Sequence, residues 1–194
     1  MPNRWALWLG IGAIGLFAVA RNAGSQEQTL QPDAKKHVVV PVIAPRAEDV
    51  SSIDGIVKAT YETISGGVGV SRQWGRDRTL YVPGIRFVAL EPDPKAGALK
   101  THISTHQEYV DEEDASFVKD GFTERELGRE THRFGNIATV LSSYEGKVAS
   151  GKVVARGVQI YQLYNDGKRW WIASLEWNEE SPENPIPPEL LLKK

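Results

Sequence analysis

The sequence contains no cysteine, which excludes disulfides, thiolate nucleophiles, Cys-based zinc sites and iron–sulfur clusters ligated by cysteine. It also lacks an excess of either charge: 23 Lys and Arg residues stand against 25 Asp and Glu residues, so the composition gives no attraction to nucleic acid. Phosphate-binding P-loops, Gly-x-Ser-x-Gly elbows and acidic calcium loops are missing as well. What is present suits one folded domain, because 41% of the 194 residues are hydrophobic and six are tryptophan.

The amino terminus is typical of an export signal. An uncharged apolar run covers residues 5–20, after Arg4 and before a polar stretch. This run is shorter than the roughly 20 apolar residues that a membrane-spanning helix needs. We therefore predict a signal peptide over residues 1–25, cleaved after Ser25 or Ala20, and a secreted or periplasmic protein with no stable membrane insertion. An uncleaved N-terminal anchor is the alternative.

The rest of the chain divides into three parts. Residues 26–49 are polar and then β-branched around Pro41, which predicts a linker with an extended lead-in. Residues 50–180 carry the periodic patterns of a domain. Residues 181–194 form a Pro-rich tail, and we expect its leucines to dock on the body.

Helices are predicted first and long strands afterwards. An apolar stripe follows Ser51, which has capping-box spacing with Asp54, residues 74–81 suit a short helix, and Thr105 with Glu108 opens another. The predicted strands cover residues 85–90, 98–103, 122–134, 137–144, 153–164 and 169–177, with turn signals between them. This order predicts an α+β domain in which an antiparallel sheet wraps around the helices.

Three segments carry a family resemblance: residues 122–145, 156–177 and 183–191. With the order of elements, they are similar to the nuclear-transport-factor-2-like superfamily in its SnoaL-like bacterial branch. The resemblance implies a cone, in which a curved antiparallel sheet encloses a pocket beside a long helix, and it implies a homodimer. It implies no single activity, because the superfamily hosts isomerases, dehydratases, cyclases and binding modules.

His132 is the first candidate for chemistry. Alternation along residues 122–134 places Glu126, Glu130 and His132 on one strand face, where a carboxylate would orient the imidazole as a general base. The competing interpretation is a solvated strand face with charged pairs, which is the commoner arrangement. Asp77, close to Trp74, is a second acid–base candidate if it faces the pocket. A surface ion pair with Arg76 or Arg78 is its alternative.

Further candidates would hold a ligand rather than react with it. Trp74, near the expected pocket mouth, and Tyr81, about two turns further on, are aromatic candidates. Arg156 and Gln162 are polar candidates, and Trp170 would form an apolar wall. Core packing, with Arg156 in a structural ion pair, is the alternative for this set. His102 and His106 have the spacing of a helical metal pair, but they straddle a predicted helix start, so we expect no metal and no other cofactor.

The last predicted strands are partly apolar on both faces, which predicts that something covers the second face. A second subunit or the Pro-rich tail would cover this face. The leading hypothesis is an exported domain that binds a small apolar molecule and forms a homodimer. The alternatives are a cofactor-free isomerase, dehydratase or cyclase, and an interaction module whose pocket is filled by its own side chains.

Overall fold

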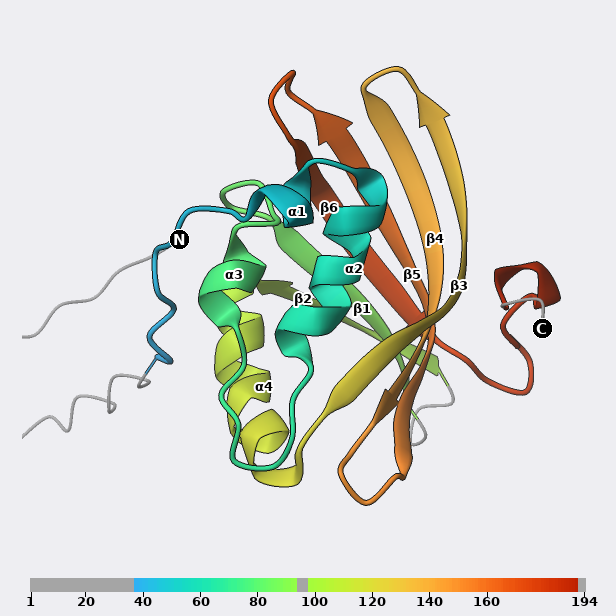
Figure 1. Ribbon diagram of the computed structural model, residues 1–194. Coiled ribbons are helices and arrows are strands. Elements are labelled where there is room, and N and C mark those ends of the chain that lie inside the picture. The colour runs from blue at the N-terminus through green and yellow to red at the C-terminus, as the bar shows by residue number, and fades with distance from the viewer. Residues whose placement is uncertain (1–36, 94–97, 192–194) are drawn as a thin grey trace, which may run out of the picture. The chain divides into compact units, whose positions relative to one another are not determined.

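The computed structural model describes residues 37–93 and 98–191. The predicted signal peptide and the polar part of the linker, residues 26–36, lie outside these residues. No helix within the described ranges is long and apolar enough to cross a membrane. The described part contains the α+β arrangement predicted from the sequence, with the helices on one side of a curved sheet (Figure 1).

The helices begin at side-chain caps where the sequence provides them. Ser52 caps α2 by accepting a hydrogen bond from the backbone N–H of Gly55 at 2.9 Å, one residue later than the spacing of Ser51 indicates. The capping box of Thr105 and Glu108 is confirmed at the start of α4. The α-helices of the described part are α1 (Ala47–Val50), α2 (Ile53–Ile64), α3 (Trp74–Arg78) and α4 (His106–Asp120).

Six strands form one open sheet in the order β2-β1-β6-β5-β4-β3. Neighbouring strands are antiparallel except β1 and β6, which run parallel. The tight turns use glycine at positive φ, 56° at Gly135 and 90° at Gly167, which a side chain would disfavour. The strands are β1 (Arg86–Asp93), β2 (Ala98–Thr105), β3 (Thr123–Phe134), β4 (Ile137–Lys147), β5 (Val153–Asn165) and β6 (Trp170–Glu179).

The core lies between α2 and the inner face of the sheet. Ile56 and Val57 of α2 are fully buried, and they belong to the same cluster as Val140, Tyr161 and Ile172 of the sheet. A helix that presents one apolar stripe must bury it against another layer, and the curved sheet supplies that layer (Figure 1). The helix, the sheet and their order therefore follow from the hydrophobic pattern.

The tail covers part of the outer face of the sheet, as the sequence predicts. Its 3₁₀ turn η1 (Pro188–Leu190) lies beside β3, on the side away from the helices (Figure 1). Leu190 and Ile186 are buried against Leu127 of β3. Gly128 permits this approach, because a Cβ at that position would lie 2.4 Å from the carbonyl oxygen of Leu190. The tail thus covers the outer face beside β3.

A β-bulge in β3 overturns the prediction that Glu126 and His132 share a face. The register of β3 against β4 shifts between Glu126 and Gly128. Glu126 pairs with Tyr144, whereas His132 pairs with Thr139, so the two side chains lie on opposite faces of the sheet. Simple alternation fails here because the bulge inserts one extra residue.

Candidate functional site

A cavity of about 340 Å³ lies between α4, the end of α2 and the inner face of the sheet. Residues of α2, α4, β1 and β3 to β6 contribute to its wall, so the cavity forms only when the helices pack on the sheet. Seven aromatic residues line it: Tyr81, Phe87, Tyr109, Phe117, Phe122, Tyr144 and Trp177. The wall is therefore largely apolar, as is usual for sites that bind small molecules.

Glu124, at the beginning of β3, is the most notable acid of the cavity wall. It lies before the bulge and pairs with Gly146, so its side chain faces inward as Glu126 does. Burial raises the pKa of the Glu124 carboxyl to about 7, and a hydrogen bond from Gln159 opposes this rise only in part. A carboxyl that titrates near neutral pH can both take and return a proton.

A chain of hydrogen bonds holds Glu124 and its neighbours in place. Nε2 of Gln159 donates to a carboxylate oxygen of Glu124 at 3.1 Å. The hydroxyl of Tyr161 donates to Oε1 of the same amide at 2.8 Å, and Thr60 lies 3.0 Å from that hydroxyl. Because Tyr161 donates to the amide oxygen, the amide nitrogen is turned toward Glu124. The carboxyl of Glu124 is therefore positioned by residues of β5 and α2.

The charge of Glu124 affects the pKa of two tyrosines in the cavity wall. Burial raises the pKa of Tyr144 and Tyr109, and the charge of Glu124 raises both further. Tyr144 is only 3% exposed and its hydroxyl has no hydrogen-bond partner among the described residues. Tyr144 lines the cavity, so its unpartnered hydroxyl leaves a donor and an acceptor for a bound molecule.

Asp77 and His106 form a second buried cluster beside the cavity. Nε2 of His106 lies 2.8 Å from Asp77, whose other carboxylate oxygen accepts the hydroxyl of Thr63 at 2.7 Å. Tyr81 donates to Asp77 at 3.4 Å and lines the cavity, whereas Asp77 is only 1% exposed. Asp77 thus pairs with a histidine and not with Arg76 or Arg78. It contacts the cavity through Tyr81.

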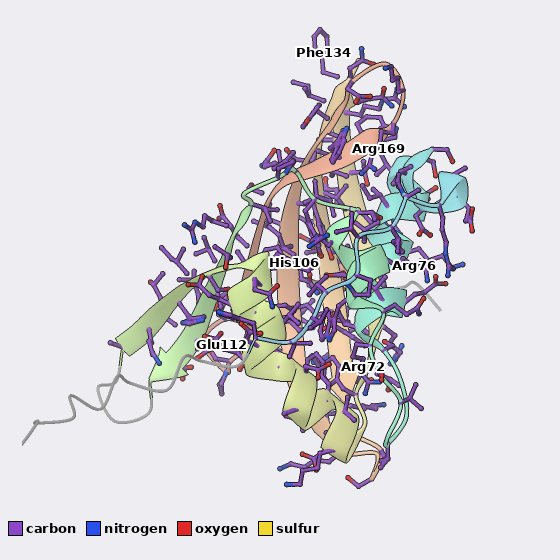
Figure 2. All side chains as sticks on the ribbon, turned by 90° about the vertical axis from the view of Figure 1, so that its left-hand side faces the viewer. Arg72, Arg76, His106, Glu112, Phe134 and Arg169 are labelled. Atoms are coloured by element: carbon purple, nitrogen blue, oxygen red, sulfur yellow. The ribbon has the colours of Figure 1, made fainter. Side chains whose placement is uncertain are left out.

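The two histidines considered as a metal pair contact different acids. His106 and Glu112 both lie on α4 (Figure 2). Nε2 of His106 contacts Asp77, whereas Nε2 of His102 on β2 lies 2.9 Å from Glu112. The described residues contain no group of three or more side chains suited to a metal ion.

The other catalytic candidates lie away from the cavity. His132 is exposed on the outer face and pairs with Glu130 at 3.0 Å, which matches the solvated-face interpretation. Glu126 faces inward, but its carboxylate accepts two hydrogen bonds from Arg129 and one from Ser142. It lines a second groove on that side, which Glu124 also borders, and its charge is paired with Arg129.

Of the predicted ligand-binding residues, Tyr81 alone is among the described residues lining the cavity. Trp74 is buried in a separate cluster and donates its indole N–H to Asp114 at 2.5 Å. Arg156 forms an ion pair with Glu180. Gln162 is exposed and accepts a hydrogen bond from Thr139, and Trp170 is buried in the main core beneath Arg133.

Sequence reasoning missed Glu124, Gln159, Tyr109, Tyr144 and Trp177 as parts of one site. A signal existed for Glu124, because alternation along the strand already grouped it with Glu126. Nothing in the sequence distinguishes the two acids, since the difference depends on where Arg129 and Gln159 come to lie in the folded sheet.

Comparison with solved structures finds proteins to which this chain is similar in structure. A protein of unknown function from Mycobacterium tuberculosis aligns with a TM-score of 0.51 and 15% identity, over 71% of this chain and 80% of that one. A protein with a cystatin-like fold from Nostoc punctiforme aligns with a TM-score of 0.49 and 8% identity, over 70% of this chain and 92% of that one. An NTF2-like protein from Shewanella baltica aligns with a TM-score of 0.42 and 11% identity, over 66% of this chain and 91% of that one. Both of the latter are also of unknown function.

No family model matches the chain, and no curated protein matches its sequence. Likeness at such low identity concerns the fold and carries no reaction or ligand across. The curved, unclosed sheet with helices on one side is the architecture that the sequence resemblance implied.

Proposed function

We propose that the protein binds a small, largely apolar molecule in the cavity between α4 and the sheet. The observation that carries this proposal is the cavity itself, about 340 Å³ and lined by seven aromatic residues. Its volume falls within the range of about 300 to 1,000 Å³ that is usual for small-molecule sites. The alternative, an interaction module whose pocket is filled by its own side chains, does not account for a cavity of this volume.

Binding of the neutral fluorescent probe N-phenyl-1-naphthylamine tests this proposal. Ala155 lines the cavity, so Ala155→Trp would fill it, while Val153 on the same strand is exposed and does not line it. We expect saturable binding to the natural protein, binding at least tenfold weaker to Ala155→Trp, and unchanged binding to Val153→Trp. The proposal fails if the probe does not bind, or if the cavity-filling variant binds it as well as the control.

A second candidate function is cofactor-free proton transfer, and one observation favours it. Glu124 lies in the cavity wall with its pKa raised to about 7, close to the optimum for a general base at neutral pH. In this proposal Glu124 replaces His132, Glu126 and Asp77 as the residue that touches the substrate. It would abstract a proton next to a carbonyl group, while Tyr144 donates a hydrogen bond to the enolate oxygen.

Hydrogen exchange of a simple ketone separates binding from catalysis. The α-protons of 2-tetralone in D₂O, followed by NMR, should exchange faster with the natural protein than with buffer, with a rate that rises through a midpoint near pH 7. Glu124→Gln should abolish the acceleration and still bind the neutral probe. Equal acceleration by Glu124→Gln would exclude Glu124 as the base.

Export and dimerisation are further proposals, and both come from the sequence. Residues 1–36 lie outside the described part of the chain, so the mass of the mature protein must decide cleavage after Ser25 or Ala20. The tail already covers the outer face beside β3. A homodimer would therefore have to use the rest of that face, and light scattering at micromolar concentration tests for it.

A further inference from the structure

We infer that the molecule bound in the cavity carries a positively charged group on an apolar body, as a hydrophobic amine does. This inference rests on the proposed binding function and names the class of ligand for that site. It comes from the sign of the charges around the cavity, the arrangement of its rings and the unpartnered hydroxyl of Tyr144.

The charged groups of the cavity wall are all acidic. The described lining residues include no Lys, Arg or His, although the chain as a whole has 23 basic against 25 acidic residues. Composition therefore does not explain the bias. None of the acidic residues forms an ion pair with a described residue, whereas acids elsewhere in the fold do so repeatedly. The acids are Glu91, Glu113, Asp120, Glu124 and Glu179.

Glu113 and Glu179 both lie close enough to Glu91 for its charge to disfavour theirs. The pKa of Glu113 is raised by burial and by the charges of Glu112 and Glu91, with only His102 opposing the rise. His102 itself pairs with Glu112. The pKa of Glu179 is likewise raised by burial and by Glu91. A cation bound among them would relieve this repulsion, while an anion would add to it.

Three aromatic rings beside the acids are arranged as walls at steep angles to one another. The ring centroids of Phe87 and Tyr109 are 5.5 Å apart at 86°, and those of Tyr109 and Trp177 are 6.2 Å apart at 72°. Phe87 and Trp177 are 6.3 Å apart at 58°. The three rings pack against one another and all line the cavity, and aromatic faces attract ammonium groups.

The hydroxyl of Tyr144 supplies an independent indication of a polar ligand atom. Its side chain is buried and lines the cavity, yet its oxygen has no partner among the described residues. The charges of both Glu124 and Glu179 raise its pKa, so it lies near both acids. A protonated amine has hydrogens to donate to this oxygen and to the two carboxylates together.

Calorimetric titration with three ligands of one body tests the inference: 4-phenylbutylamine, 4-phenylbutanol and 4-phenylbutyrate at pH 8. We expect the amine to bind at least tenfold more tightly than the alcohol, and the carboxylate more weakly than either. If the alcohol binds as tightly as the amine, the inference on charge is overturned while the proposed binding function stands. If none of the three binds, both fail.

Charge variants distinguish the wall from the rest of the surface. The double variant Glu113→Gln with Glu179→Gln should reduce the preference for the amine over the alcohol to less than threefold and leave the affinity for the alcohol unchanged. Glu130→Gln, on the exposed outer face beside His132, should retain the full preference. An amine preference that survives in the double variant overturns the assignment to these acids.

Discussion

Glu124 accepts a hydrogen bond from Nε2 of Gln159 at 3.1 Å, and this contact links β3 to β5 on the inner side of the sheet. Glu126, two residues along the strand, instead accepts two hydrogen bonds from Arg129. An amide leaves the charge of a carboxylate uncompensated, whereas a guanidinium neutralises it. Two glutamates on one face thus have different chemistry, and the one in the cavity is the acid with a pKa near neutral.

The pKa of Glu124 predicts a pH-dependent stability. A folded-state pKa of about 7 lies above the usual value of about 4.3 in an unfolded chain, so the folded protein holds the proton more tightly between these values. The contribution of Glu124 to stability is therefore full below about pH 4 and is lost as the pH rises through about 7.

The variant Glu124→Gln isolates this contribution. The free energy of unfolding of the variant, relative to the natural protein, should rise by at most about 3 kcal/mol between pH 4 and pH 8. Urea denaturation at the two pH values measures it, and the other buried acids cancel because both proteins share them. A difference that does not change with pH would show that Glu124 titrates as an exposed glutamate.

The buried pair of Asp77 and His106 should be important for stability. Asp77→Ala removes the partner of His106 and of the Thr63 hydroxyl inside the protein, and we expect a loss of roughly 3 to 5 kcal/mol in the free energy of unfolding. His102→Ala breaks the half-exposed pair with Glu112 and should cost less than about 1 kcal/mol. Equal losses in urea denaturation would argue that Asp77 has no special role.

Docking of the tail should contribute measurably to stability. Leu190→Ala removes a buried side chain and should cost about 2 to 4 kcal/mol. Gly128→Ala should also destabilise, by about 1 to 3 kcal/mol, because its new methyl group would meet the carbonyl oxygen of Leu190. If both act on one contact, the double variant should lose less than the sum of the two. If the two losses in the free energy of unfolding add fully, the effect of Gly128→Ala does not come from its contact with Leu190.

His132 should be dispensable. It lies exposed on the outer face, with a single pair to Glu130. We expect His132→Ala to change the free energy of unfolding by less than about 0.5 kcal/mol and to leave binding of the neutral probe unaltered. Loss of probe binding in this variant would indicate that the binding site lies on the outer face of the sheet and not in the cavity.

The elements that local chemistry determines could be predicted from the sequence. The capping box of Thr105 with Glu108 marks the start of α4, and the turn that contains Gly167 separates β5 from β6. Each depends on residues within a few positions of one another. The Pro-rich tail was predicted to dock because its leucines need a buried place, and Leu190 finds one.

The candidate site could not be predicted in the same way. The bulge beside Gly128 has no signature that alternation detects, and it moves His132 to the face opposite Glu126. The pKa of Glu124 depends on its burial and on Gln159, which lies 35 positions away in the sequence. Such properties arise only when distant segments meet, so no local pattern reveals them.

An isotope-filtered NOE spectrum of the ¹³C-labelled protein with unlabelled 4-phenylbutanol locates the bound molecule directly. Cross-peaks should join the phenyl protons to the methyl groups of Leu175 and to the indole of Trp177, both in the cavity wall. Cross-peaks only to Leu99 and Ile103, which are exposed on β2, would contradict a ligand cavity between α4 and the sheet.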